Sequence, residues 1–115
     1  MSITKEEVME KMKEKNTVVL DVLPKTDYDL LRIKGSQCLP LVGTRPEKFV
    51  QEVEEKYGKD KFFITYCSGY PCRHFMEAAT ALTQAGLKAE GYAGGIKEWA
   101  ESGFPVEGVQ AKAFN

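Results

Sequence analysis

Hydrophobic and polar positions divide the chain into segments with helical spacing and short, nearly continuous apolar runs. Two of the helical segments begin with the pattern of a capping box, in which a threonine is followed three residues later by a glutamate. The pairs are Thr4 with Glu7 and Thr44 with Glu47. Apolar residues three or four positions apart predict helices over residues 5–15, 27–32, 45–57, 75–85 and 96–101.

The apolar runs are rich in β-branched and aromatic residues, a composition typical of buried strands. They predict strands over residues 17–22, 37–39, 61–66 and 88–92. Because strands alternate with helices, we expect an α/β fold with a central, mostly parallel sheet and helices on both of its faces. Residues 106–115 are only weakly patterned. No repeat or linker divides the chain, so we expect residues 1–115 to form a single domain.

The composition is that of an ordinary globular protein, with 43% hydrophobic and 29% charged residues. The formal net charge of -1 gives no reason to expect binding to nucleic acid or to an anionic membrane surface. No apolar run approaches the roughly 20 residues that a membrane-spanning helix needs. The first residues show no signal-peptide pattern, and we therefore expect a cytoplasmic protein.

The chain contains three cysteines, Cys38, Cys67 and Cys72. An odd number in a chain of ordinary composition argues against a disulfide scaffold and favours a reducing compartment. The cysteines lack a pair spaced for zinc, and His74 is the single histidine, so four good zinc ligands are hard to assemble. We expect no metal and no cofactor.

Cys67 is the strongest candidate for a functional side chain because of its position. It follows the predicted strand 61–66 and precedes a short loop and a predicted helix. Open α/β sheets bind ligands beyond the carboxyl ends of their strands, and a helix N-terminus favours a thiolate over a thiol. The N–H groups of the loop can form an anion-binding nest, and Arg73 can pair with an oxyanion. The alternative is that Cys67 is a small buried hydrophobic residue.

Four other side chains have both a functional and a structural interpretation. Cys72 is a candidate resolving thiol for an oxidised Cys67, or else a spacer in the first helical turn. His74 could carry a proton, although a histidine just inside a helix is more often a surface or capping residue. Asp21 could contact the site, although an aspartate at a strand end more often anchors the following turn. Cys38 is expected in the core.

Four stretches, in this order along the chain, form a recognisable combination. The first is Val18–Val22 with its aspartate, and the second is Ile33–Pro40. The third is Tyr66–Ala79, which holds the cysteine loop and its helix. The fourth is Gly91–Trp99, followed by Gly103-Phe104-Pro105. Each stretch alone is weakly diagnostic, but the ordered set resembles the single-domain rhodaneses.

This resemblance implies a rhodanese-like three-layer fold and a sulfurtransferase of the thiosulfate type. In that family the loop cysteine takes a sulfur atom from thiosulfate, polysulfide or a persulfide and holds it as a persulfide. The sulfur then passes to cyanide or to a thiol, on a small molecule or on a protein. By position, Cys67 would be the persulfide carrier. The loop that binds the anionic donor would comprise Ser68, Gly69, Tyr70, Pro71, Cys72 and Arg73.

The loop also departs from the common family pattern. The family commonly has an arginine five residues after the cysteine, where this chain has Cys72, and Arg73 follows one position later. Matching the helix beyond it makes this loop longer than the common form. Leu23 stands where an arginine often occurs, and Arg32 stands where a histidine is usual. The identity of the donor therefore stays open.

Two alternative functions follow from the same loop. Rhodanese-fold phosphatases and arsenate reductases have a cysteine, five residues and an arginine, and the span from Cys67 to Arg73 matches that spacing. However, Pro71 lacks an N–H donor for a phosphate cradle, and no carboxylate lies in the loop to act as a general acid. We rank this alternative below sulfur transfer. The other alternative is a redox-sensing module in which Cys67 and Cys72 cycle between thiols and a disulfide.

Overall fold

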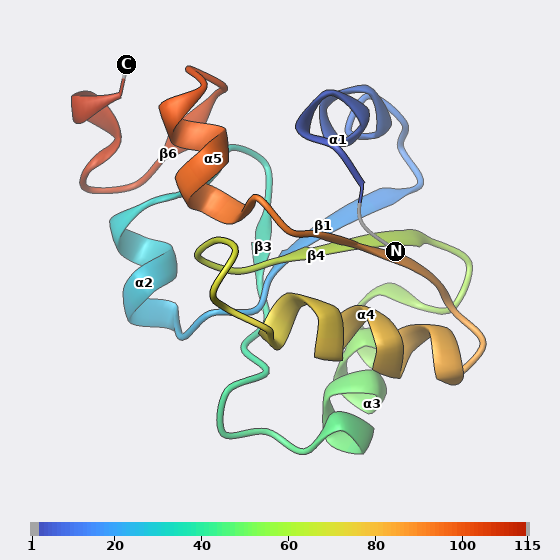
Figure 1. Cartoon of the computed structure of the whole chain (residues 1–115). Coiled ribbons are helices and arrows are strands. Elements are labelled where there is room, and N and C mark those ends of the chain that lie inside the picture. Colours follow the sequence, from blue (N-terminus) through green and yellow to red (C-terminus); the bar gives the residue numbers. More distant parts are fainter. Residues whose placement is uncertain (1–2, 115) are drawn as a thin grey trace.

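A sheet of four parallel strands forms the centre of the computed structural model, which describes residues 3–114 (Figure 1). The strands are β1 (Thr17–Asp21), β3 (Gln37–Cys38), β4 (Phe62–Tyr66) and β5 (Lys88–Tyr92). Their order is β3-β1-β4-β5, so β4 is an inner strand between β1 and β5. The predicted α/β fold with a mostly parallel sheet is confirmed.

Helices cover both faces of this sheet. They are α1 (Lys5–Lys11), α2 (Lys25–Leu30), α3 (Pro46–Tyr57), α4 (His74–Gln84) and α5 (Gly95–Glu101), with a 3₁₀ turn, η1, at Ala111–Ala113. In Figure 1, α3 and α4 lie below the sheet and α1 and α5 lie above it. None of the helices within residues 3–114 has both the length and the apolar composition of a membrane-spanning segment.

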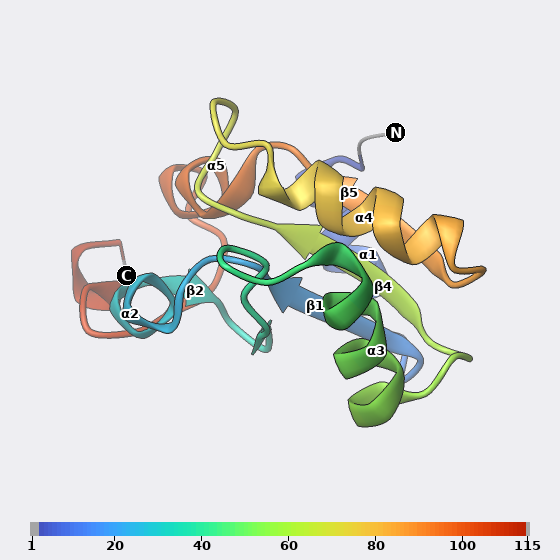
Figure 2. The ribbon, with the colours of Figure 1, turned by 90° about the horizontal axis from the view of Figure 1, so that it is seen from below.

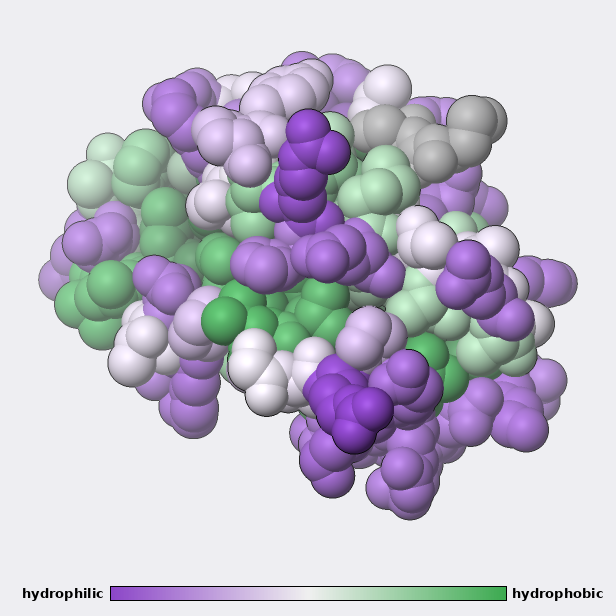
Figure 3. Space-filling view, turned by 60° about the horizontal axis from the view of Figure 1, so that its bottom comes forward, coloured by the Kyte–Doolittle hydropathy of each residue, from purple (hydrophilic) through white to green (hydrophobic). Residues whose placement is uncertain are grey.

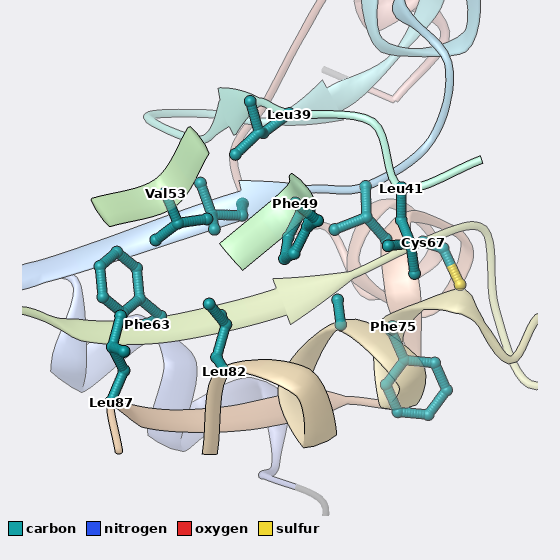
Figure 4. Packing of buried hydrophobic residues seen from close by; sticks show 12 residues of the cluster. Leu39, Leu41, Phe49, Val53, Phe63, Cys67, Phe75, Leu82 and Leu87 are labelled. Atoms are coloured by element: carbon teal, nitrogen blue, oxygen red, sulfur yellow. The ribbon is translucent and has the colours of Figure 1, made fainter. Parts of the chain in front are cut away.

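Each face of the sheet has its own hydrophobic core. On one face, Phe49 of α3 and Leu82 of α4 belong to the same buried cluster as Phe63 of β4 (Figure 4). On the other face, Trp99 of α5 belongs to a second cluster with Ile64 of β4. Phe63 and Ile64 are neighbours in one strand, so they point to opposite faces, and both are fully buried. This two-sided burial explains why the strand has a continuous apolar run in the sequence.

A second, two-stranded sheet was not predicted from the sequence. It pairs β2 (Arg32–Ile33) with β6 (Val106–Glu107) in antiparallel register. Ile33 and Val106 are buried in the second cluster, and the side chains of Arg32 and Glu107 form an ion pair with an N···O distance of 3.6 Å. Two residues carry too little periodicity to predict a strand, and their pairing depends on a contact between distant parts of the chain.

The two predicted capping boxes have different outcomes. Thr4 and Glu7 form theirs at the start of α1, although α1 ends at Lys11, earlier than predicted. The box predicted for Thr44 is wrong, because the N-cap of α3 is the next residue, Arg45, and no side chain caps this end. A proline disfavours helical backbone angles in the residue before it, so Pro46 makes Arg45 the boundary residue.

Candidate active site

Cys67 lies directly after the carboxyl end of β4, an inner strand of the four-stranded sheet. Residues 67–73 form a loop that leads into α4, which begins at His74. Figures 1 and 2 both show this loop extending beyond the end of β4, close to α5. Ligands of open α/β sheets bind at this edge, where the carboxyl ends of parallel strands meet. The structure therefore places Cys67 where the sequence predicts it.

The first turn of α5 holds the start of the loop. The N–H of Ile96 donates to the carbonyl oxygen of Cys67, and the N–H of Lys97 donates to that of Ser68, both at 3.0 Å. These donors belong to a helix N-terminus and have no acceptor within the helix. In a trans peptide the carbonyl and the N–H that follows point in opposite directions. The N–H groups of Ser68 and Gly69 therefore point away from α5.

Some N–H groups of the loop are free to bind a ligand, and others are not. Within residues 3–114, five of them donate no hydrogen bond to the chain: those of Cys67, Ser68, Gly69, Tyr70 and Arg73. The N–H of Cys72 donates to the carbonyl oxygen of Gly69 at 3.0 Å, and Pro71 has no N–H. The loop can therefore bind an anion through its two ends but not through positions 71 and 72.

Gly95 permits the close approach of α5 to the loop. A Cβ atom at this position would lie 2.5 Å from the carbonyl oxygen of Cys67 and 2.7 Å from the nitrogen of Gly69. Its backbone φ of +64° is also one that side-chain-bearing residues rarely adopt. The first residue of α5 is thus the point of contact with the cysteine loop.

Cys67 and Cys72 are joined by a disulfide that closes the loop, with a Cα–Cα distance of 6.5 Å. Only 1% of the Cys67 surface is exposed, and the residue belongs to the first hydrophobic cluster. Figure 4 shows it at the end of that cluster where Leu41 and Phe75 lie. Cys72 is half-buried and packs against the same cluster. The structure thus brings the sulfur of Cys72 to that of Cys67.

Positive charge lies at the far end of the loop. Arg73 is exposed and is the N-cap residue of α4, whose first turn has no side-chain cap. Within residues 3–114, no carboxylate forms an ion pair with Arg73. A free guanidinium next to an uncapped helix N-terminus favours an anion at this end. His74 instead pairs with Glu77 on the surface, with Nδ1 and Oε1 3.0 Å apart, which agrees with its structural interpretation.

Asp21 anchors the turn after β1, as its structural interpretation predicts. The N–H of Leu23 donates to Oδ1 of Asp21 at 3.0 Å. Asp21 is fully buried opposite Tyr66, and its Oδ2 has no hydrogen-bond partner within residues 3–114. Burial raises the pKa of this carboxyl from 3.8 to about 6, although the hydrogen bond from Leu23 opposes the shift. The strand β1, which pairs with β4, therefore ends in a buried carboxyl group whose ionised form is disfavoured.

Cys38 lies outside the core, so the expectation for this residue is wrong. It is a half-buried free cysteine in β3 and belongs to neither hydrophobic cluster. The reason is that β3 is a short strand at the edge of the sheet, with a neighbour on one side only. Burial raises the pKa of the Cys38 thiol. Within residues 3–114, no three histidine, cysteine, aspartate or glutamate side chains gather where they could hold a metal ion.

A hollow of about 410 Å³ lies beside the loop, on the side of α5. Its apolar lining comprises Leu31, Pro71, Ile96, Ala100 and Phe114. Figure 3 shows apolar surface on the left side of the molecule, where Figure 1 places α2 and the C-terminal segment. No pattern in the sequence marks Leu31 or Phe114 as a neighbour of the loop, because the tail that contains Phe114 is only weakly patterned.

The rhodanese-like domain family model matches residues 4–102 of the chain. Together with the parallel sheet and the loop cysteine at the end of β4, this match identifies the class of protein. The chain belongs to the rhodanese-like domain family. The family that the sequence resembles is therefore confirmed.

Solved structures show the same fold. The BH2092 protein of Bacillus halodurans has a TM-score of 0.81 and 23% sequence identity over 95% of this chain and 77% of that chain. The rhodanese-like domain of the Alr3790 protein of Anabaena has a TM-score of 0.77 and 21% identity over 95% and 80% of the two chains. A rhodanese-related protein of Thermoplasma volcanium has a TM-score of 0.64 and 28% identity over 92% and 96%. No curated protein sequence matches the chain.

Substitution of Gly95 by alanine tests the contact between α5 and the loop. Gly103 lies just beyond the other end of α5, with a φ of +79° and open space around it, so Gly103→Ala is the matched control. We expect Gly103→Ala to lower the free energy of unfolding by about 1–2 kcal/mol, the cost of a left-handed backbone. Gly95→Ala should cost about 3 kcal/mol or more, because its Cβ also collides with the loop backbone. Equal losses in urea titrations would contradict the close approach.

The buried carboxyl of Asp21 predicts a pH-dependent stability. In the folded chain the Asp21 carboxyl keeps its proton up to a pH of about 6, whereas in the unfolded chain this carboxyl releases its proton near pH 3.8. The free energy of unfolding should therefore fall as the pH rises through this window, by up to about 3 kcal/mol. Asp21→Asn is the control, because an amide can still accept from Leu23 but does not ionise. If wild type and Asp21→Asn show parallel profiles between these pH values, the carboxyl has an ordinary pKa.

Proposed function

We propose that this chain is a sulfurtransferase that carries a sulfane sulfur as a persulfide on Cys67. The main support is the position of Cys67 at the end of an inner strand, followed by the unpaired N–H groups of Ser68 and Gly69. These groups point away from α5 and are suited to stabilise a thiolate or a persulfide anion. Membership of the rhodanese-like domain family adds a second, independent line of support.

The reaction divides into two transfers. The thiolate of Cys67 attacks the outer sulfur of thiosulfate, a new S–S bond forms, and sulfite leaves with the electron pair of the old S–S bond. Cyanide then attacks the outer sulfur of the persulfide, thiocyanate leaves, and the Cys67 thiolate is restored. A thiol, on a small molecule or on a protein, can replace cyanide as acceptor. The protein needs no cofactor for either step.

Reduction must precede the first transfer. A cysteine in a disulfide is not a nucleophile, so the form with the Cys67–Cys72 bond is inactive until a reductant opens it. A cytoplasmic location, which we propose for the protein, would supply thiol reductants. A disulfide within this short loop is compatible with a reducing compartment, because it joins two residues of the proposed site and is not part of a disulfide scaffold.

The charges near the loop suit a small anionic donor. Arg73 is unpaired within residues 3–114 and stands next to the uncapped start of α4. Arg32, at the position where the family usually has histidine, is occupied elsewhere: it pairs with Glu107 and lies over the ring of Tyr28 at 4.7 Å. Leu23 brings no charge. One free cation supports thiosulfate, polysulfide or a persulfide as donor and does not distinguish among them.

A phosphatase or arsenate reductase is the second candidate, and the spacing of Cys67 and Arg73 favours it. A phosphate cradle, however, needs successive N–H groups directed at the anion. This loop lacks two of them, because Pro71 has no N–H and the N–H of Cys72 is bonded to Gly69. We therefore place phosphoryl chemistry below sulfur transfer.

Thiocyanate formation from thiosulfate and cyanide tests the proposal on reduced protein. Cys67→Ser should lower kcat/KM by at least about 1,000-fold, because the variant lacks the attacking thiolate. Cys72→Ser should lower it at most partly, by less than about tenfold, because cyanide reaches the persulfide directly. Sulfur transfer that persists in Cys67→Ser would refute the assignment. Hydrolysis of an aryl phosphate, lost in Cys67→Ser and without sulfur transfer, would establish the phosphatase instead.

A further inference from the structure

We propose that Cys72 is an internal acceptor for Cys67: it releases the carried sulfur as hydrosulfide, and a dithiol reductant then resets the protein. This inference rests on the proposed function of Cys67 as a persulfide carrier. It adds a second catalytic residue, a product and a class of co-substrate. External acceptors such as cyanide compete with Cys72 for the same persulfide.

The geometry of the loop supports this role for Cys72. Its Sγ is bonded to the Sγ of Cys67, and the Cα–Cα distance of 6.5 Å lies within the range usual for disulfides. The hydrogen bond from the N–H of Cys72 to the carbonyl oxygen of Gly69, at 3.0 Å, folds the loop back toward Cys67. Both cysteines pack against the same hydrophobic cluster. Cys72 therefore reaches the inner sulfur of a Cys67 persulfide with the loop in the conformation observed.

The position of attack decides the product. A persulfide on Cys67 has an inner sulfur, Sγ, and an outer sulfur that came from the donor. When the Cys72 thiolate attacks Sγ, a Cys67–Cys72 disulfide forms, and the outer sulfur leaves as hydrosulfide with the electron pair of the broken bond. The persulfide already has the oxidation level of a disulfide, so the persulfide and the Cys72 thiol together give one disulfide and one hydrosulfide without an external oxidant. The hydrosulfide keeps the proton of the persulfide or takes the one that the Cys72 thiol releases. Attack on the outer sulfur would instead move the persulfide to Cys72 and release nothing. The bonded Sγ atoms in the structure correspond to the first route.

The exposure of the two cysteines determines how the disulfide is reduced. Cys67 is buried, whereas Cys72 is half-buried and lies beside the exposed Tyr70 and Pro71. An external thiolate therefore attacks Cys72, and Cys67 leaves as the thiolate that the loop N–H groups stabilise. A dithiol is suited to this step, because its second thiol displaces Cys72 from the mixed disulfide. The dithiol becomes a disulfide, and both protein thiols are restored.

Single-turnover loading separates this mechanism from simple persulfide storage. Reduced wild type, Cys72→Ser, Cys72→Ala and Cys38→Ser are freed of reductant, treated with thiosulfate or polysulfide, and desalted. Hydrosulfide release and intact mass are then followed with time. Wild type and the control Cys38→Ser should release one equivalent of hydrosulfide and end with two hydrogens fewer than the reduced protein. Both Cys72 variants should keep one added sulfur and release hydrosulfide at least about tenfold more slowly, because they lack the intramolecular thiol.

The outcomes separate this proposal from the function on which it rests. If wild type keeps its added sulfur as long as Cys72→Ser does, Cys72 is not the acceptor, although Cys67 is still a carrier. Equal hydrosulfide release from wild type and both Cys72 variants also overturns the proposal. If folded Cys72→Ser gains no sulfur from either donor, the proposed function of Cys67 itself is wrong.

A multiple-turnover assay with dithiothreitol as sole acceptor gives a second measurement. Wild type should produce hydrosulfide at least about tenfold faster than Cys72→Ser.

Discussion

Two hydrogen bonds from the first turn of α5 to the carbonyl oxygens of Cys67 and Ser68 determine the arrangement of the site. They use N–H groups that a helix start leaves without partners, and they turn the loop N–H groups of Ser68 and Gly69 the other way. Gly95 is what allows the two backbones to come this close. The helix α5 begins more than twenty residues after the loop ends. It nevertheless determines the direction in which the N–H groups of Ser68 and Gly69, next to Cys67, can bind an anion.

The sheet supplies the second constraint, because Cys67 directly follows a strand whose burial on both faces fixes its position. The residues before it, from Phe63 to Tyr66, are fully buried between two hydrophobic cores. Cys67 itself is 1% exposed, so its reactivity depends on the groups immediately around it rather than on solvent. Cys72 is the reactive partner within reach, and the loop can therefore couple sulfur transfer to thiol–disulfide exchange in one small site.

Much of this architecture could be predicted from the sequence, for identifiable reasons. The inner strands have long apolar runs, and Thr4 and Glu7 have a local capping pattern, so both features are encoded by adjacent residues. The pairing of Arg32–Ile33 with Val106–Glu107 depends on distant segments and left no periodic signal. The half-buried position of Cys38 follows from its place on an edge strand, which only the sheet order reveals. The anchoring of the loop by α5 and the proximity of Phe114 to it are likewise tertiary features that no local pattern encodes.

The location of an added sulfur atom tests the central claim most directly. Reduced Cys72→Ser, in which the persulfide has no internal thiol to react with, is loaded with thiosulfate or polysulfide and alkylated, and the peptide that contains the loop is fragmented in a mass spectrometer. The account predicts one additional sulfur atom, assigned to Cys67. An added sulfur on Cys38, or a Cys67 that is alkylated without any added sulfur under every donor, would contradict it.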